Sequence, residues 1–499
     1  MKLLSFAKSA MIGGLALFTS VALGQFSGTV DWGATTSFQG TVVAAACDSS
    51  GGDYNGYVYV LLKVAETGGP AARPLPELAG EASYYAPRDK SALALLSKAP
   101  AHSDLAKLSN ELKFAPIAPA PSKLVVGSKY AVIAYNSSGT YEWGHSYPTT
   151  TSFVWYNPQA ITVNGGNVYC TGYCNDGLVA VQPGGPTSVP TTIYTIRIPE
   201  ATPSTFTESY YNNTAGGSTD PQDFGLGIAT DSSGNVLISG AHAFDSSSPL
   251  YIQVVGYTST LGSPTAYLTT YSGTAPYICR NKTSGVVVEG TATISSNEYV
   301  YVGGYSYSAG TISNAFNDTY ASGSGVQCQA SGICVGNNYI YAVGYNQVSL
   351  SFNDFVLQIP ESSPTTVTAG GTNTWSTPYV VAADGTDHVY VAGISNGIEV
   401  AGYAYSNLTT AMWTSNYAQR IKKTTGIIGV ATDGSHVYVG ATQTNNIAVG
   451  FNASTGALEA ANVTEPNYAV AFAFNSNTLR VILSGTSATT GLAYTYQYH

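Results

Sequence analysis

The feature that most constrains the fold is a short phrase that returns along the chain. Residues 429–443 read GVATDGSHVYVGATQ, which is two apolar runs joined by a polar turn. Related phrases occur at residues 41–64, 160–174, 228–242, 292–306, 332–346, 381–395 and 468–487. A strand, a tight turn and a second strand form the pattern of a β-hairpin. The nearly continuous apolar runs are typical of strands that are covered on both faces.

A second hairpin pattern follows several copies, for example at residues 398–417 and 447–462, and its last strand often carries a large aromatic side chain. The unit is therefore four antiparallel strands repeated about every 45–50 residues, the size of a propeller blade. This predicts an all-β propeller of eight blades, with seven as the alternative because the units at 41–64 and 300–320 are irregular. Residues 27–36 read as a lone fourth strand, which we expect to complete the last blade and close the ring.

Two copies carry a family likeness. ATDSSGNVLISG at residues 229–240 and ATDGSHVYVG at residues 431–440 resemble the repeats of secreted β-propeller proteins, which read roughly A-x-D-x-x-G-N-x-Y-V-x-G. The resemblance covers much of residues 125–499, and it implies the fold and an extracellular setting but no activity. NASTGALEA at residues 452–460 is also similar to the repeat of quinone-dependent dehydrogenase propellers, although that family's regular Trp-docking pattern is absent.

The N-terminus and the charge bound the cellular setting. Residues 1–24 have the basic start, apolar stretch and small-residue cleavage site of a signal peptide. We therefore expect residues 25–499 to form a secreted or cell-surface propeller, and no later apolar run predicts a membrane span. The net charge is −10 and only 9% of residues are charged, which argues against nucleic acid and anionic membranes as partners.

One segment interrupts the repeat. Residues 65–122 are rich in Ala, Pro and Leu, and residues 91–99 and 103–114 are predicted to be helical. We expect a small helical insertion between the second and third strands of the first blade. It is either a packed surface ornament or a lid or docking arm at one face of the ring.

The chain has six cysteines, and an even number in a secreted protein predicts disulfides. The favoured pairing joins the cysteines nearest in sequence and leaves the other two together: Cys170–Cys174, Cys328–Cys334 and Cys47–Cys279. Other connectivities remain open.

Three aspartates, Asp231, Asp384 and Asp433, occupy the same turn position in different copies. A short carboxylate there accepts backbone N–H groups two or three residues further on, so we interpret the three as structural turn residues. Catalysis would use one or two special carboxylates and would not repeat them from blade to blade.

The search for a metal or catalytic site gives few candidates. Asp48, Asp53 and Asn55 are the candidate Ca²⁺ ligands, although their spacing does not fit the EF-hand loop. No cofactor is predicted beyond this Ca²⁺. His242 and Asp245 are close in sequence, but neither has a visible nucleophile partner. The 38 tyrosines suit both a packed core and a wet binding face.

These observations favour a binding, adhesion or envelope-assembly module. Its expected partners are glycans, other cell-envelope proteins or further copies of the chain. The alternative is an extracellular enzyme at the mouth of the central channel, acting on carbohydrate or a small alcohol. A structural coat or filament subunit is the second alternative.

Overall fold

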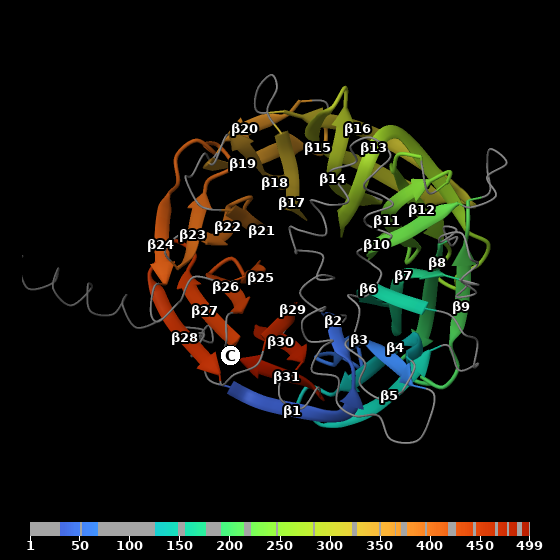
Figure 1. The fold of residues 1–499 in the computed structure, drawn as a ribbon. Coiled ribbons are helices and arrows are strands. Elements are labelled where there is room, and N and C mark those ends of the chain that lie inside the picture. The colour runs from blue at the N-terminus through green and yellow to red at the C-terminus, as the bar shows by residue number, and fades with distance from the viewer. Residues whose placement is uncertain are drawn as a thin grey trace, which may run out of the picture.

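The computed structural model describes eighteen segments of the chain: residues 30–49, 52–67, 125–147, 155–175, 191–213, 221–245, 248–282, 285–321, 327–348, 351–364, 366–370, 377–394, 397–417, 426–442, 446–464, 468–476, 479–486 and 492–498. Within them the secondary structure is all β-strand (Figure 1). None of these segments forms a helix that could cross a membrane. The strands form four-stranded antiparallel sheets around a central axis, which we number as blades 1 to 8.

The first four blades are, from the innermost strand outward: blade 1, β2 (Thr41–Cys47), β3 (Val58–Thr67), β4 (Val125–Tyr135) and β5 (Tyr141–Tyr147); blade 2, β6 (Trp155–Asn164), β7 (Asn167–Asn175), β8 (Thr191–Pro199) and β9 (Thr207–Tyr211); blade 3, β10 (Gln222–Thr230), β11 (Val236–Ala243), β12 (Tyr251–Tyr257) and the first half of β13 (Thr265–Arg280); blade 4, the second half of β13, then β14 (Val286–Ile294), β15 (Asn297–Ser308) and β16 (Thr311–Tyr320).

The last four blades follow the same order: blade 5, β17 (Gln327–Val335), β18 (Tyr339–Val348), β19 (Ser351–Pro360) and β20 (Thr368–Gly370); blade 6, β21 (Thr377–Ala383), β22 (Val389–Ile394), β23 (Ile398–Tyr403) and β24 (Trp413–Tyr417); blade 7, β25 (Gly426–Thr432), β26 (His436–Thr442), β27 (Asn446–Asn452) and β28 (Leu458–Thr464); blade 8, β29 (Tyr468–Asn475), β30 (Arg480–Thr486), β31 (Leu492–Tyr498) and β1 (Val30–Gln39).

The N-terminal strand is the outermost strand of blade 8, as the sequence predicts. β1 pairs antiparallel with β31, with Val30 opposite Tyr498 and Gln39 opposite Leu492 (Figure 1). A second link joins blade 8 to blade 1 near the axis. The Val42 N–H donates to the Thr486 hydroxyl (2.9 Å), which in turn donates to the Gly40 carbonyl (3.3 Å).

The core lies between the blades. Among the described residues, eight large clusters of buried apolar side chains each draw on two neighbouring blades, including blade 8 and blade 1. The middle strands are therefore covered on both faces; all eight residues of β11 are buried. This explains the continuous apolar runs, because a single blade could not bury its own faces.

A β-bulge explains the glycine of the repeat. In every blade the register shifts once along the innermost strand. In seven of the eight, the second strand has glycine opposite the shift: Gly172, Gly240, Gly290, Gly344, Gly393, Gly440 and Gly485. A Cβ at Gly172, Gly240 or Gly290 would lie 2.0, 1.8 or 2.2 Å from a carbonyl oxygen of the innermost strand. Only glycine leaves room for that carbonyl.

Two expectations change at this stage. The phrase at residues 292–306 forms the second and third strands of blade 4, because β13 runs on from blade 3 and supplies the innermost strand. The copy is therefore one strand out of phase with the others. The predicted helices at 91–99 and 103–114 lie outside the described residues. β3 and β4, which flank residues 68–124, pair antiparallel as the second and third strands of blade 1.

Gly240→Ala should lower the free energy of unfolding by about 3 kcal/mol or more, because the new methyl group meets a backbone carbonyl that a rotamer change does not relieve. Gly385→Ala is the matched control: a Cβ there meets nothing within 4 Å, so its effect should stay within about 0.5 kcal/mol. Chemical denaturation of both variants measures the difference. Equal effects of the two substitutions would contradict this account of the repeat glycine.

Candidate functional site

The turns between first and second strands and those between third and fourth strands lie on one face of the molecule, which we call the turn face. In blade 7 this turn is organised by Asp433. One of its oxygens accepts the N–H groups of Ser435 and His436, each at 2.7 Å. The other accepts the Tyr438 hydroxyl at 2.8 Å and lies 2.9 Å from His436 Nδ1. Because Tyr438 is buried on β26, these bonds tie the turn to the core.

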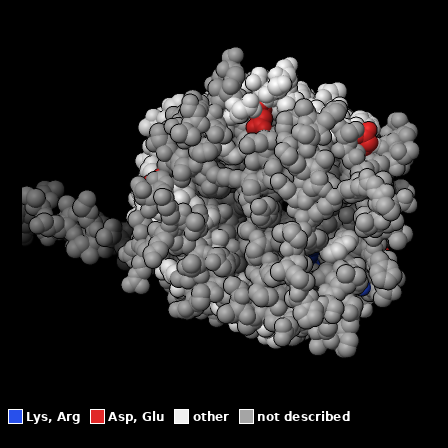
Figure 2. All heavy atoms as spheres, viewed as in Figure 1, with Lys and Arg blue, Asp and Glu red and all other residues white. Residues whose placement is uncertain are grey.

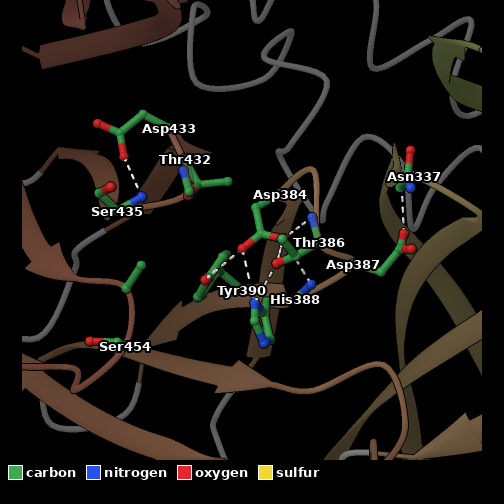
Figure 3. Close-up of polar contacts among 12 residues, drawn as sticks. Asn337, Asp384, Thr386, Asp387, His388, Tyr390, Thr432, Asp433, Ser435 and Ser454 are labelled. Atoms are coloured by element: carbon green, nitrogen blue, oxygen red, sulfur yellow. Dashed lines mark hydrogen bonds and ion pairs between the residues drawn. The ribbon is translucent and has the colours of Figure 1, made fainter.

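Asp384 makes the same arrangement in blade 6 (Figure 3). Its Oδ1 accepts the Thr386 N–H (2.8 Å), the Thr386 hydroxyl (2.7 Å) and the His388 N–H (3.0 Å). Its Oδ2 accepts the Tyr390 hydroxyl (3.1 Å) and lies 3.1 Å from His388 Nδ1. The motif D-x-x-(x)-H-x-Y thus describes one carboxylate held by its own turn.

Asp231 is the third predicted turn residue, in blade 3. It accepts the N–H groups of Ser233 (2.8 Å) and Asn235 (2.9 Å), and the Asn235 amide replaces the histidine at 2.9 Å. The hydrogen bonds of Asp231, Asp384 and Asp433 go to groups of their own turns and to the strand that follows. This geometry holds a turn and leaves no carboxylate directed at a ligand.

A fourth aspartate, which the sequence analysis does not single out, joins two blades. Asp387 lies in the turn of blade 6 with a left-handed backbone (φ 63°), a conformation that aspartate tolerates better than most residues. Its carboxylate accepts the N–H groups of Asn337 and Asn338 (3.1 Å for Asn338) and the Asn338 side-chain amide (2.9 Å) in blade 5 (Figure 3). Its carbonyl accepts the Tyr341 hydroxyl at 3.1 Å.

Beside this link, two tyrosine rings stack across the seam between blades 5 and 6. The rings of Tyr339 and Tyr405 lie 5.9 Å apart at 27°, and Tyr405 is 48% exposed. The Tyr341 ring lies 6.1 Å behind Tyr339. The buried Gln358 side chain donates to the Tyr341 hydroxyl (3.4 Å) and to the Tyr405 carbonyl (3.0 Å). We call Tyr339 and Tyr405 the tyrosine platform.

Polar uncharged groups surround the platform. Asn337 and Asn338 are exposed beside Tyr339, and Asn407 is exposed in the same turn as Tyr405. Lys282 donates to the Asn337 side chain at 3.2 Å. On the face of the molecule that Figure 2 shows, charged groups of the described residues are few and scattered. The platform is thus an exposed aromatic surface with amides at its edges, a combination common where Tyr meets a partner.

The sequence signal for the platform is indirect. The tyrosine excess suggests either a core or a binding face, and most of it is core: the largest fully buried side chains are all tyrosines. Their hydroxyls reach turn groups, as Tyr390 and Tyr438 do. Tyr405 differs because it sits in a turn, but its partner lies in another blade, and the sequence alone does not pair them.

The predicted disulfides are wrong. No disulfide joins the six cysteines, all of which lie in described segments. Cys170 and Cys174 share strand β7, and an extended strand places residues four apart at about 13 Å, against at most about 7 Å between the Cα atoms of a disulfide. Cys328 and Cys334 share β17 in the same way. Cys47 and Cys279 belong to blades 1 and 4.

The candidate Ca²⁺ ligands lie in the turn after β2. Asp48 is buried (4% exposed), whereas Asp53 is exposed. The Asn55 N–H donates to the Gly52 carbonyl at 3.1 Å, which closes the turn. Within the described residues, no group of three or more His, Cys, Asp or Glu side chains is placed to hold a metal ion. The structure thus separates Asp48 from Asp53.

His242 pairs with a different carboxylate from the one near it in sequence. Its Nδ1 lies 3.0 Å from Asp223, and Asp223 also accepts the Gln253 amide at 2.8 Å and the Asn213 N–H at 2.8 Å. The side chains of Asp223, His242 and Gln253 are fully buried. Asp245 instead accepts the Ser248 N–H at 2.7 Å. We interpret the buried cluster as a link that fixes the start of blade 3 to the end of blade 2.

Comparison with known proteins supports the fold. No protein-family model matches the chain, and no curated protein matches it in sequence. Sqt1 from Chaetomium thermophilum is similar at a TM-score of 0.51 and 8% identity, over 93% of this chain and 96% of that one. The Dos1 propeller is similar at 0.48 and 11% identity, over 74% and 88%. The chain has a β-propeller fold.

A third similar structure is the quinohemoprotein alcohol dehydrogenase ADHIIG from Pseudomonas putida HK5, with a TM-score of 0.36 and 11% identity over 76% of this chain and 66% of that one. At these identities, likeness to a solved structure shows the fold alone.

The turn aspartates give the protein an acid-sensitive contribution to stability. Burial alone would raise the pKa of Asp433, but hydrogen bonds from His436, Tyr438 and Ser435 outweigh it and lower the pKa. A lowered folded pKa stabilises the native state above the unfolded pKa of about 3.9, and this stabilisation is lost as the pH falls through the folded value. Asp433→Asn should therefore cost about 1–3 kcal/mol at pH 7, and its difference from the parent should shrink below about pH 4.

Denaturation curves at several pH values between about 2 and 7 measure this effect. Asp53→Asn, at an exposed turn position, is the control and should change stability by less than about 0.5 kcal/mol. A difference between Asp433→Asn and the parent that stays constant down to the lowest pH would contradict the prediction.

Proposed function

We propose that the chain is a secreted or cell-surface propeller that binds hydroxyl-rich ligands, glycans foremost, in adhesion or envelope assembly. The tyrosine platform carries the proposal. An aromatic ring packs well against the C–H face of a sugar, and amides such as those of Asn337 and Asn338 hydrogen-bond to hydroxyl groups directly or through water. The sugar class and the cell-surface location are part of this proposal.

The support of the platform favours binding over a chance exposure of apolar rings. Asp387 fixes the turn that carries Asn337 and Asn338, and Gln358 fixes the backbone of Tyr405. A ligand would therefore meet rings and amides that are already ordered, which lowers the entropy cost of binding. The low charge of the chain agrees with a neutral ligand, and the signal-peptide pattern of residues 1–24 agrees with export.

A glycan array probed with the purified residues 25–499 tests the proposal, with affinities then measured in solution for each sugar that binds. Tyr405→Ala should weaken binding about tenfold or more, because truncating an aromatic anchor typically costs more than the 1.4 kcal/mol that a factor of ten represents. Tyr405→Phe keeps the ring and should retain most of the affinity.

Tyr141→Ala is the matched control. Tyr141 is 50% exposed on the outer strand of blade 1, but it is not part of the platform, so its removal should leave binding unchanged. Equal losses for Tyr141→Ala and Tyr405→Ala would contradict a specific platform. An array without saturable binding would overturn the glycan proposal, and concentration-dependent self-association of the same sample would then favour the coat or filament alternative.

A further inference from the structure

A second site of interest lies at the seam between blades 1 and 2, away from the tyrosine platform. Glu200 follows β8 and is 3% exposed. Its N–H donates to the Gly166 carbonyl at 3.0 Å, and a Cβ at Gly166 would lie 3.8 Å from its Oε2. The carboxyl group therefore lies over the bare backbone of the β6–β7 turn. Neither of its oxygens accepts a hydrogen bond of full geometry, although both are buried.

Two side chains of blade 1 face this carboxyl group. Asp48 is 4% exposed. Tyr59 is fully buried, and its hydroxyl lies beside Glu200 without reaching full hydrogen-bond geometry. Burial raises the pKa of Glu200 to about 7, the Tyr59 hydroxyl opposes the shift, and the charge of Asp48 adds to it. Two acidic groups are thus buried near each other, which is costly unless a cation compensates them.

A neutral oxygen completes the group. Asn167 lies opposite Pro199, the residue before Glu200, in the pairing of β7 with β8. Its side-chain N–H₂ donates to the Gly165 carbonyl at 2.9 Å. The amide orientation is therefore fixed, and the Asn167 Oδ1 atom is buried without a partner. In the part of the chain that the structure describes, no Lys, Arg or His side chain bonds to Glu200.

We propose that this seam is a Ca²⁺ site whose protein ligands include Asp48, Glu200 and Asn167. The donors are all oxygen atoms, the preference of a hard cation. Two carboxylates and an amide from three separate turns suit the large and irregular coordination sphere of Ca²⁺ better than the strict octahedron of Mg²⁺. The site retains Asp48 from the turn of β2, but its other ligands come from blade 2.

The bound ion would join the first two blades at the turn face, as Asp387 joins blades 5 and 6. Ca²⁺ would bind the folded chain and not the unfolded one, because its ligands meet only when both blades are in place. It should therefore raise the thermal unfolding temperature in a concentration-dependent way. This effect involves no glycan, so its failure and the failure of glycan binding are separate results.

The experiment uses residues 25–499 freed of metal with a chelator and then titrated with Ca²⁺ by calorimetry and by thermal unfolding. We expect saturable binding of Ca²⁺ and a rise in unfolding temperature. Glu200→Gln should weaken binding at least tenfold, and Asn167→Leu, at a partly exposed turn position, should weaken it in the same direction. Glu399→Gln, an exposed glutamate of blade 6, is the matched control and should bind Ca²⁺ like the parent.

Several outcomes would overturn the proposal. One is the absence of any Ca²⁺-dependent heat or temperature shift in the parent. Another is a shift that persists unchanged in both Glu200→Gln and Asn167→Leu while circular dichroism shows that the variants are folded. An equal shift with Mg²⁺ at the same concentration would overturn the assignment to Ca²⁺. If Glu200→Gln does not fold, Asn167→Leu alone decides the result.

Discussion

The close approach of the first two strands of each blade is the constraint on which the fold depends. A bulge in the innermost strand directs a carbonyl at the neighbouring strand, and glycine opposite the bulge makes room for it. The bulge adds twist to the strand nearest the axis, where the blades are most crowded. Blade 1 has Leu62 and Leu61 opposite its shift, so the arrangement does not need glycine in every copy. Its recurrence in the other seven explains why the repeat keeps that residue.

The turn face depends on a second recurring interaction. Tyrosine rings fill the seams between blades, and their hydroxyls reach the carboxylates or carbonyls of the turns, as in Tyr438 to Asp433 and Tyr341 to Asp387. The apolar core and the polar turns are therefore joined by one residue type. Function enters where this pattern changes. Tyr405 lies outside the core with a supported backbone, and Glu200 is a buried acid with no such partner.

The sequence predicts the local part of this architecture and little of the rest. Hairpin periodicity, the turn aspartates and the lone strand at residues 27–36 are encoded within short segments, and the structure contains eight four-stranded blades with β1 beside β31. The phrase at 292–306 is misplaced by one strand because β13 serves two blades without a turn between them. The cysteine pairs fail because nearness in sequence means separation along an extended strand.

The candidate sites were hidden for a related reason. Tyr339 with Tyr405, and Asp48 with Glu200, meet across seams between blades, and each member looks like an ordinary turn or core residue in its own segment. Only the packing of one blade on the next brings them together. Periodicity reports what a blade shares with its neighbours, whereas a binding site depends on what one seam does differently.

The pairing of β1 with β31 also sets an order of events in folding. A polypeptide is made from its N-terminus, so β1 emerges first and its partner last. Bringing two ends of a long chain together is entropically costly and slow. Blades 1 to 7 have all their strands before β31 exists, while blade 8 waits for the whole chain. During that interval β1 is without its partner and β31, once made, presents an open edge. The time between the completion of synthesis and the docking of β1 is therefore when this protein is most exposed to aggregation and proteolysis.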